Sequence, residues 1–276
     1  MSSEARIGTA TGPAAAQRRS PPGWLVLSLL SGLLVLSLGV AVSAGTVSIP
    51  LDQVWQIAAN RLRPGSYEPT WSAGRESIVW DLRFPRALLG VLVGAGLAAT
   101  GAVLQAATRT PLADPFLFGM SAGAALGAVA VITHLGDFAG ASTLPAAVVG
   151  AALVWFRFQA PRLNALLLGD ETAVALGIPV GRLRLMLFAA SALVTAVLVA
   201  LSGAIGFVGL IIPHILRRLV GGDNRRVIPL SAMAGALFLV WTDLFARTLL
   251  APQELPIGIL TAAVGGTYFA WSLTRR

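Results

Sequence analysis

The side chains that could do chemistry in this chain are few, and they lie in apolar surroundings. Asp243 sits within an apolar run, one helical turn before Arg247. An acid in such a run could relay protons, but an arginine four residues on can pair with it instead. His214 follows a proline and could ligate haem iron, while His134 lies near the end of another run. We interpret Asp243 and Arg247 as a structural pair, His214 as structural and His134 as interfacial.

The composition excludes several other kinds of site. All 20 basic residues are arginines, so no P-loop of the form G-x-x-x-x-G-K-[ST] exists, and any ATP must be bound by another polypeptide. The chain has no cysteine, which excludes disulfides, thiolate metal sites and cysteine nucleophiles. No H-E-x-x-H and no carboxylate pair at catalytic spacing occurs. We therefore predict that the chain is not an enzyme and holds no cofactor or metal.

The overall composition is that of an integral membrane protein. Of the 276 residues, 56% are hydrophobic and only 12% are charged, and several apolar runs reach the roughly 20 residues that cross a bilayer. The alternating segments typical of a membrane β-barrel do not occur. The net charge of +8 could suggest nucleic-acid binding, but an excess of arginine in cytoplasmic loops accounts for it. The prediction is an all-α, polytopic membrane bundle with no nucleic-acid partner.

The apolar runs predict about eight spanning helices, with both termini in the cytoplasm. A polar cytoplasmic tail, residues 1–23, precedes the membrane domain, residues 24–276. Most arginines then fall on the cytoplasmic side. Arg247 and the arginines of the long loop 45–85 fall outside, but such counting is less decisive for a long loop. A signal peptide is the competing interpretation of the first run, which is too long for a typical signal core. The expected spans are about 24–44, 87–107, 119–133, 144–158, 185–201, 205–219, 227–245 and 256–273.

Two segments are predicted to be helical without crossing the membrane. One is a short helix near 51–61 within the long loop. The other lies in an amphipathic segment, 163–184, where Asp170 should cap a helix over 171–176 and Gly177 should end it, with Pro179 beyond. This second helix would lie outside the bilayer, on the cytoplasmic side.

Several motifs, in this order along the chain, resemble one family of transport proteins. They are WDLRFPR (80–86), GAGLAATGAVLQAATRTPLADPFLFGMSAGAALGA (94–128), RLNALLLGDETAVALGI (162–178), GAIGFVGLIIPHILRRLVGGDNRRVIP (203–229) and QELPIGILTAAVGGTYFAW (253–271). Together they resemble the permease subunits of bacterial ABC importers for iron chelates, haem and cobalamin, the FecCD type. The resemblance runs from about residue 79 to the C-terminus.

The chain also departs from the family pattern. Thr110 stands where the family usually has Asn, and Phe118 where Leu is usual. The family usually has ten helices, whereas here one run, 144–158, stands where three are expected. The loss of two helices keeps every later helix in the same orientation. A natural short form and an incomplete sequence would look the same at this point.

The resemblance assigns roles to three groups of residues. Arg83, Arg86 and Arg247, at the outer ends of apolar runs, would dock a periplasmic binding protein, although snorkelling to the interface is the alternative. The cytoplasmic coupling segment, 163–184, would contact an ATPase through Leu166, Leu167, Leu168, Gly169, Asp170, Glu171, Thr172, Ala173, Leu176 and Gly177. Helix packing and gating would involve Gly119, Gly123, Gly127, Gly206, Gly209 and Pro213. Met120, near Ser121, could line a path, but core packing is the simpler interpretation.

The resulting hypothesis is a transmembrane permease domain, residues 24–276, that works as a homodimer in the bacterial inner membrane. Its expected partners are two ABC ATPase subunits, which bind the ATP and Mg²⁺, and a periplasmic solute-binding protein. Its cargo would be an iron chelate (haem or siderophore) or cobalamin, carried by alternating access. The alternatives are a proton-coupled secondary transporter that uses Asp243 and a membrane scaffold that transports nothing.

Overall fold

The structure is a computed structural model that describes residues 23–45, 47–115, 144–251 and 253–274. All structural statements below refer to these residues. Gly119, Gly123 and Gly127 lie outside them, as do Met120, Ser121 and His134. The packing, path-lining and interfacial roles expected for these six residues therefore stay predictions.

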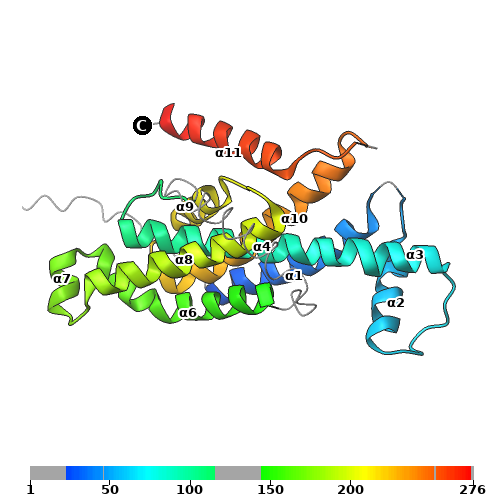
Figure 1. Cartoon of the computed structure of the whole chain (residues 1–276), viewed down its shortest axis with the longest axis horizontal. Coiled ribbons are helices and arrows are strands. Elements are labelled where there is room, and N and C mark those ends of the chain that lie inside the picture. The colour runs from blue at the N-terminus through cyan, green and yellow to red at the C-terminus, as the bar shows by residue number, and fades with distance from the viewer. Residues whose placement is uncertain (1–22, 46, 116–143, 252, 275–276) are drawn as a thin grey trace, which may run out of the picture.

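The described part of the chain is helical and contains no strand, which confirms the all-α class. The first half comprises α1 (Gly23–Ser43), α2 (Leu51–Leu62), α3 (Ala73–Ser77), the π-helix η1 (Ile78–Arg83) and α4 (Phe84–Thr108). The second half comprises α6 (Leu144–Leu167), α7 (Asp170–Ala175), α8 (Val180–Ser202), α9 (Val208–Val220), α10 (Asn224–Thr248) and α11 (Ile257–Thr274). The long helices lie side by side, with α7 at one end of the bundle and α2 and α3 at the other (Figure 1).

Helix α4 is the centre of the bundle. It contacts α6, α8, α9 and α10, and its last four turns are almost entirely buried. Alanine and glycine dominate this buried stretch, which lets the neighbouring helices come close to the α4 backbone. The position of α4 follows from this composition, because a helix surrounded on all sides needs small residues on all sides.

Two glycine pairs set the closest approaches to α4. A Cβ atom added to Gly94 would collide with the carbonyl group of Gly235 in α10, and one added to Gly101 would collide with the carbonyl group of Gly209 in α9. The obstacle in both cases is backbone, which cannot rotate out of the way as a side chain can. The α4 helix therefore depends on glycine at these two positions to hold α9 and α10 against it.

Four stretches are long and apolar enough to cross a membrane: α1, the continuous helix from Ala73 to Thr108, α8 and α10. Helices α6, α9 and α11 are not among them; α9 has only 13 residues, and α11 contains a shorter apolar helix, Ile257–Tyr268. The chain is thus a multi-pass membrane protein. Eight crossings with both termini in the cytoplasm stay a prediction.

Two expected boundaries are wrong. The run 144–158 does not end near Phe158, because α6 continues through Pro161 to Leu167, so the first residues of the amphipathic segment belong to the long helix. The span expected from residue 87 begins earlier, because α3 and η1 lead into α4 without a break and Pro85 occupies its first turn. Proline is tolerated there because its missing N–H would have no helical partner in any case.

The helix expected near 51–61 is confirmed as α2.

Replacing Gly101 by alanine should destabilise the fold by about 3 kcal/mol or more, the upper end of ordinary overpacking, because the new methyl group meets the α9 backbone. The measurement is thermal unfolding of the purified protein in detergent. Gly150→Ala in α6 is the matched control, since a Cβ atom there meets nothing within 4 Å. Equal unfolding temperatures for the two variants would contradict the close approach of α4 and α9.

Candidate functional site: the coupling helix and the arginine cluster

Helix α7 projects from one end of the bundle as a single short element (Figure 1). Its C-terminal end is closed by a Schellman motif, in which Gly177 N–H donates to Val174 O (2.8 Å) and Ile178 N–H donates to Ala173 O (3.0 Å). Gly177 has φ 76°, a conformation that suits glycine. The prediction that Gly177 ends this helix is therefore confirmed.

The prediction that Asp170 caps the helix is wrong. The N-cap is Gly169, with φ 123°, and Asp170 is the first helical residue. Its carboxylate instead accepts both terminal nitrogens of Arg184 (2.9 Å each) and forms a second ion pair with Arg109 (3.0 Å). Two arginines compete successfully with a capping N–H because bidentate, charge-assisted bonds are stronger. A further bond from Arg184 Nε to Ala107 O (3.1 Å) ties α7 to the end of α4 as well as to α8.

Three of the exposed side chains of this region are large and apolar, beside the exposed polar residues Glu171 and Thr172. Leu168, Val174 and Leu176 are 72%, 61% and 63% exposed. Their neighbours Leu166 and Ala173 are fully buried against the bundle. We call Leu168, Val174 and Leu176 the apolar tip. Ion pairs fix the inner side of α7 while the apolar tip is exposed, an arrangement suited to contact with another protein.

A second polar cluster, the asparagine clasp, joins four helices. It consists of Asn164, Arg217, Asp223 and Asn224. Asn164 Oδ1 accepts the backbone and side-chain N–H groups of Asn224 (2.9 Å each), and Asn164 Nδ2 donates to Asp223 (2.7 Å). Arg217 Nη2 donates to Asn224 Oδ1 and to Ala102 O (2.9 Å each). The clasp therefore connects the end of α6 and the start of α10 to α9 and α4.

Asp223 has a second role as the N-cap of α10, where its carboxylate accepts the Arg225 N–H (2.9 Å). Its partial burial would raise the pKa of this carboxyl group. Donation from Asn164 and the Arg225 N–H, together with the charges of Arg225 and Arg226, outweighs burial and holds the pKa of Asp223 below its usual value. The group therefore stays ionised at neutral pH and keeps both the cap and the clasp in place.

Gln105 completes the contact between α4 and α9. Pro213 lies inside α9 and has no N–H, so the carbonyl four residues earlier, Gly209 O, loses its helical partner. Gln105 Nε2 donates to Gly209 O (3.3 Å) and to Leu210 O (3.0 Å). The Gln105 side chain on α4 thus donates to the Gly209 carbonyl group, which Pro213 leaves without a partner inside α9.

Gly206 lies in the loop before α9, and a Cβ atom added there would meet nothing within 4 Å.

The three arginines expected at the outer face do come together. Arg83, Arg86 and Arg247 line one hollow of about 460 Å³ with Gly45, Val47 and Glu254. Arg83 and Arg247 are nevertheless buried, and Arg83 donates to three backbone carbonyls, those of Val42 (2.8 Å), Ser43 (3.0 Å) and Val47 (2.6 Å). Arg86 is the most exposed of the three. Their docking role stays a prediction, and Arg83 also has a clear structural role in holding the chain after α1.

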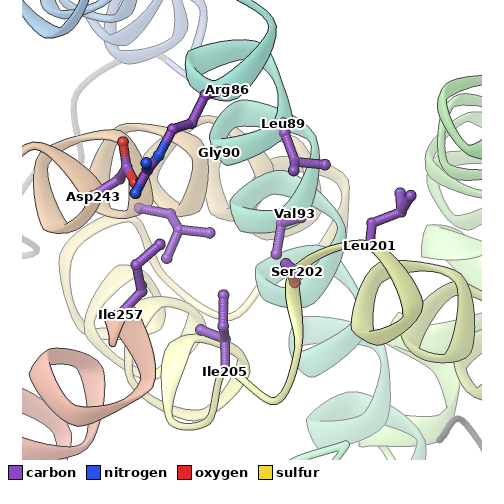
Figure 2. Close-up of a pocket in the computed structure, with 10 residues that line it drawn as sticks. Arg86, Leu89, Gly90, Val93, Leu201, Ser202, Ile205, Asp243 and Ile257 are labelled. Carbon is purple, nitrogen blue, oxygen red and sulfur yellow. The ribbon is translucent and has the colours of Figure 1, made fainter. Parts of the chain in front are cut away.

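Asp243 is fixed between two of these arginines. It is 4% exposed and accepts Arg86 Nε and Arg247 Nε at 3.0 Å each. Arg86 also reaches both carboxylate oxygens of Glu254 (3.2 and 3.0 Å). Arg86 and Asp243 point toward one another at the edge of a smaller, mostly apolar hollow of about 210 Å³ (Figure 2). The expected structural pair of Asp243 and Arg247 is confirmed, and it is part of a larger network.

The histidine that the structure describes supports packing. The His214 ring meets Tyr268 of α11 edge-on, with ring centroids 6.3 Å apart. Among the described residues, no group of three or more His, Cys, Asp or Glu side chains is placed to hold a metal ion.

Comparisons with known proteins place the chain in a family. The model of the FecCD transport family matches residues 33–156 and 140–275. The chain belongs to the FecCD transport family. The hemin transport system permease protein HmuU of Yersinia pestis is 30% identical, over 94% of this chain and 97% of the relative. The vitamin B12 import system permease protein BtuC of Vibrio cholerae is 32% identical, over 87% and 93%.

The fold agrees with this assignment to the FecCD family. A solved structure of a metal-chelate type ABC transporter in an inward-facing conformation superposes with a TM-score of 0.75, covering 91% of this chain and 99% of that one at 23% identity. The two family matches overlap on residues 140–156, within and just before α6. This overlap fits the expectation that one helix stands where the family pattern has more.

Several residues of the polar clusters of this FecCD-family chain could not be singled out from the sequence. Asn164 and Asn224 lie sixty residues apart, and nothing in their local patterns indicates that they bond. Glu254 is an ordinary loop residue until the fold brings it to Arg86. Gln105 could be noticed in the sequence, because it lies within the motif 94–128. Its partner, Gly209 O, becomes evident only from the position of Pro213 on the neighbouring helix.

The bond between Gln105 and Gly209 predicts a specific coupling energy. Gln105→Met should cost about 1 kcal/mol of stability, because Gly209 O loses its donor. The same change should cost much less in a Pro213→Ala background, since residue 213 then carries an N–H that can donate to Gly209 O within α9. The measurement is a double-mutant cycle in thermal unfolding. Equal costs of Gln105→Met in both backgrounds would contradict the assigned role.

Proposed function

We propose that this chain is the permease subunit of a binding-protein-dependent ABC importer that moves an iron chelate or cobalamin across the bacterial inner membrane by alternating access. The observation that carries the proposal is the apolar tip, which is exposed on a short helix whose other side is held by the ion pairs of Asp170. A chain with no P-loop needs a contact with a separate ATPase, and the apolar tip is built as such a contact.

The connections of α7 give the ATPase a way to move the bundle. A force on the apolar tip reaches Asp170, then Arg184 at the start of α8, and Ala107 O and Arg109 at the end of α4. ATP binding would draw two ATPase subunits together, and the coupling helices of two permease copies would follow. Helices that pack through glycines and proline, such as α9 on α4, would then shift relative to one another.

The chemistry of the walls supports a large, amphipathic cargo. The described spanning helices carry few charges, and the buried face of α4 is rich in glycine and alanine. A naked metal ion would need polar ligands to replace its water, and no such cluster occurs in the described residues. A metal already wrapped in haem, a siderophore or a corrin ring needs none. The relatives named for hemin and vitamin B12 support this class of cargo.

The outer hollow is the surface that would receive a periplasmic solute-binding protein. Arg83, Arg86 and Arg247 give it positive charge, and arginine pairs well with carboxylates on a partner. Arg86 would make the first contact, because it is the most exposed of the three and already pairs with the exposed Glu254. A carboxylate of the binding protein could replace Glu254 without leaving Arg86 unpaired.

The apolar tip yields the direct test of the proposal. Val174→Arg should reduce co-purification of the ATPase, and ATP-driven uptake into proteoliposomes, by at least about tenfold, because a charge would then be buried against the partner. Tyr67→Arg, at an exposed position on the outer loop 63–72, is the matched control and should change neither readout. Uptake that needs no ATPase, or an unchanged Val174→Arg complex, would overturn the proposal.

The alternative of a proton-coupled carrier depends on Asp243 and makes the opposite prediction. Asp243→Asn should cost about 3 kcal/mol of stability, because Arg247 loses its buried partner. The double variant Asp243→Asn with Arg247→Gln should recover part of this lost stability. Uptake by the double variant should not depend on a proton gradient. Thermal unfolding and uptake with an imposed pH gradient measure both effects. A secondary carrier would instead show full stability in Asp243→Asn and loss of gradient-driven uptake.

A further inference from the structure

Arg157 is an unusual residue in the described part of the bundle. It lies on α6, with its side chain exposed, and has no hydrogen-bond or ion-pair partner among the described residues. Its neighbours on the same face are apolar, with Val154 and Phe158 58% and 74% exposed. An unpaired charge on an apolar helix face inside a membrane protein calls for a partner from outside the bundle.

Arg157 is part of a groove of about 370 Å³ between three helices. Leu27 of α1 and Leu153, Val154 and Phe158 of α6 form two of its walls, and α10 forms the third. The α10 wall consists of Ile228, Pro229, Ala232 and Met233. Apart from the guanidinium group, every side chain that lines the groove is apolar. A ligand that fits would therefore be a hydrocarbon chain with one negative group.

The depth of Arg157 can be read from the asparagine clasp. Asn164 bonds to the first residue of α10, Asn224, so these two residues lie at the same level. Arg157 is seven residues further into α6, about 10 Å along the helix axis. It therefore lies about two turns inward from the start of α10, at the level of Ser231. From this depth the long arginine side chain can extend toward the membrane interface while its stem stays among apolar groups.

The cytoplasmic mouth of the groove is also positive. The Arg226 stem lies against the start of α1, since a Cβ atom on Gly23 would be 3.5 Å from its Cδ and Cγ. Arg225 and Arg226 are both exposed. A molecule lying in the groove would therefore meet Arg157 within the groove and two further arginines at its mouth.

We propose that this groove binds a phospholipid with a net negative head group from the cytoplasmic leaflet. One acyl chain lies between α1, α6 and α10, and the lipid phosphate pairs with Arg157. Charge complementarity favours this occupant over a neutral lipid, because basic pockets between helices on the cytoplasmic side select anionic head groups. The lipid would hold α1 and α10 to α6, the helix that leads directly into the coupling segment.

The test compares lipid retention by the intact permease complex. Native mass spectrometry counts the phosphatidylglycerol that stays bound after purification from nanodiscs containing phosphatidylglycerol and phosphatidylcholine. Arg157→Gln should lower the retained phosphatidylglycerol about fivefold, and should reduce the gain in unfolding temperature that this lipid gives over pure phosphatidylcholine. Arg182→Gln, an exposed arginine at the start of α8 outside the groove, should leave both values unchanged.

Two further variants exclude other occupants. Val154→Trp fills the groove from an exposed wall position, so it should displace the lipid while leaving the fold intact. Because the chain has no cysteine, a single Val154→Cys substitution can form a disulfide only between two copies. Efficient cross-linking would mean that a second copy covers the groove and would overturn the proposal. Equal retention by Arg157→Gln and the wild type, or equal losses in Arg157→Gln and Arg182→Gln, would overturn it as well.

Discussion

The contact between α4 and the first turn of α9 determines how closely this bundle can pack. Gly101 removes the side chain that would collide with Gly209, and Gln105, one turn further along α4, donates to the carbonyl that Pro213 leaves without a helical partner. Each of these residues is unfavourable alone, because a buried amide, a helical proline and a mid-helix glycine all cost stability. Together the Gln105 amide nitrogen and the Gly209 carbonyl satisfy one another, and the contact holds α9 against the largely buried helix α4.

The polar groups at the α7 end of the bundle extend this contact to the surface. Arg217, in the last turn of α9, reaches Ala102 O next to Gly101 and Asn224 of the asparagine clasp. The Asp170 ion pairs reach Ala107 O by way of Arg184, further along the same helix. The apolar tip, the clasp and the α4–α9 contact therefore share α4 as their common support. Because α4 is bonded to other helices along its length, a force applied to α7 can displace the helices that pack against α4.

The sequence predicted the helical class, the position of the short helix α7 and the grouping of Arg83, Arg86 and Arg247, because these follow from local patterns. Long apolar runs, a glycine after a short helix and arginines at the ends of runs each carry their own physical reason. It could not predict the partners of Asp170, since a capping role and an ion pair with Arg184 both fit the local sequence. It placed the end of α6 too early, because Pro161 and Arg157 look like a boundary but the helix continues through both. For Asp170, the deciding group, Arg184, lies on another helix.

Helix α6 lies where the two family matches overlap. Both matches include residues 140–156, and the same helix continues to Leu167, shortly before α7. Helix α7 then emerges at the end of the bundle where α4 and α8 hold it. The wall that α6 contributes to the groove is apolar apart from Arg157. A bilayer covers such a face readily, whereas Arg157 requires a negative partner at the same depth.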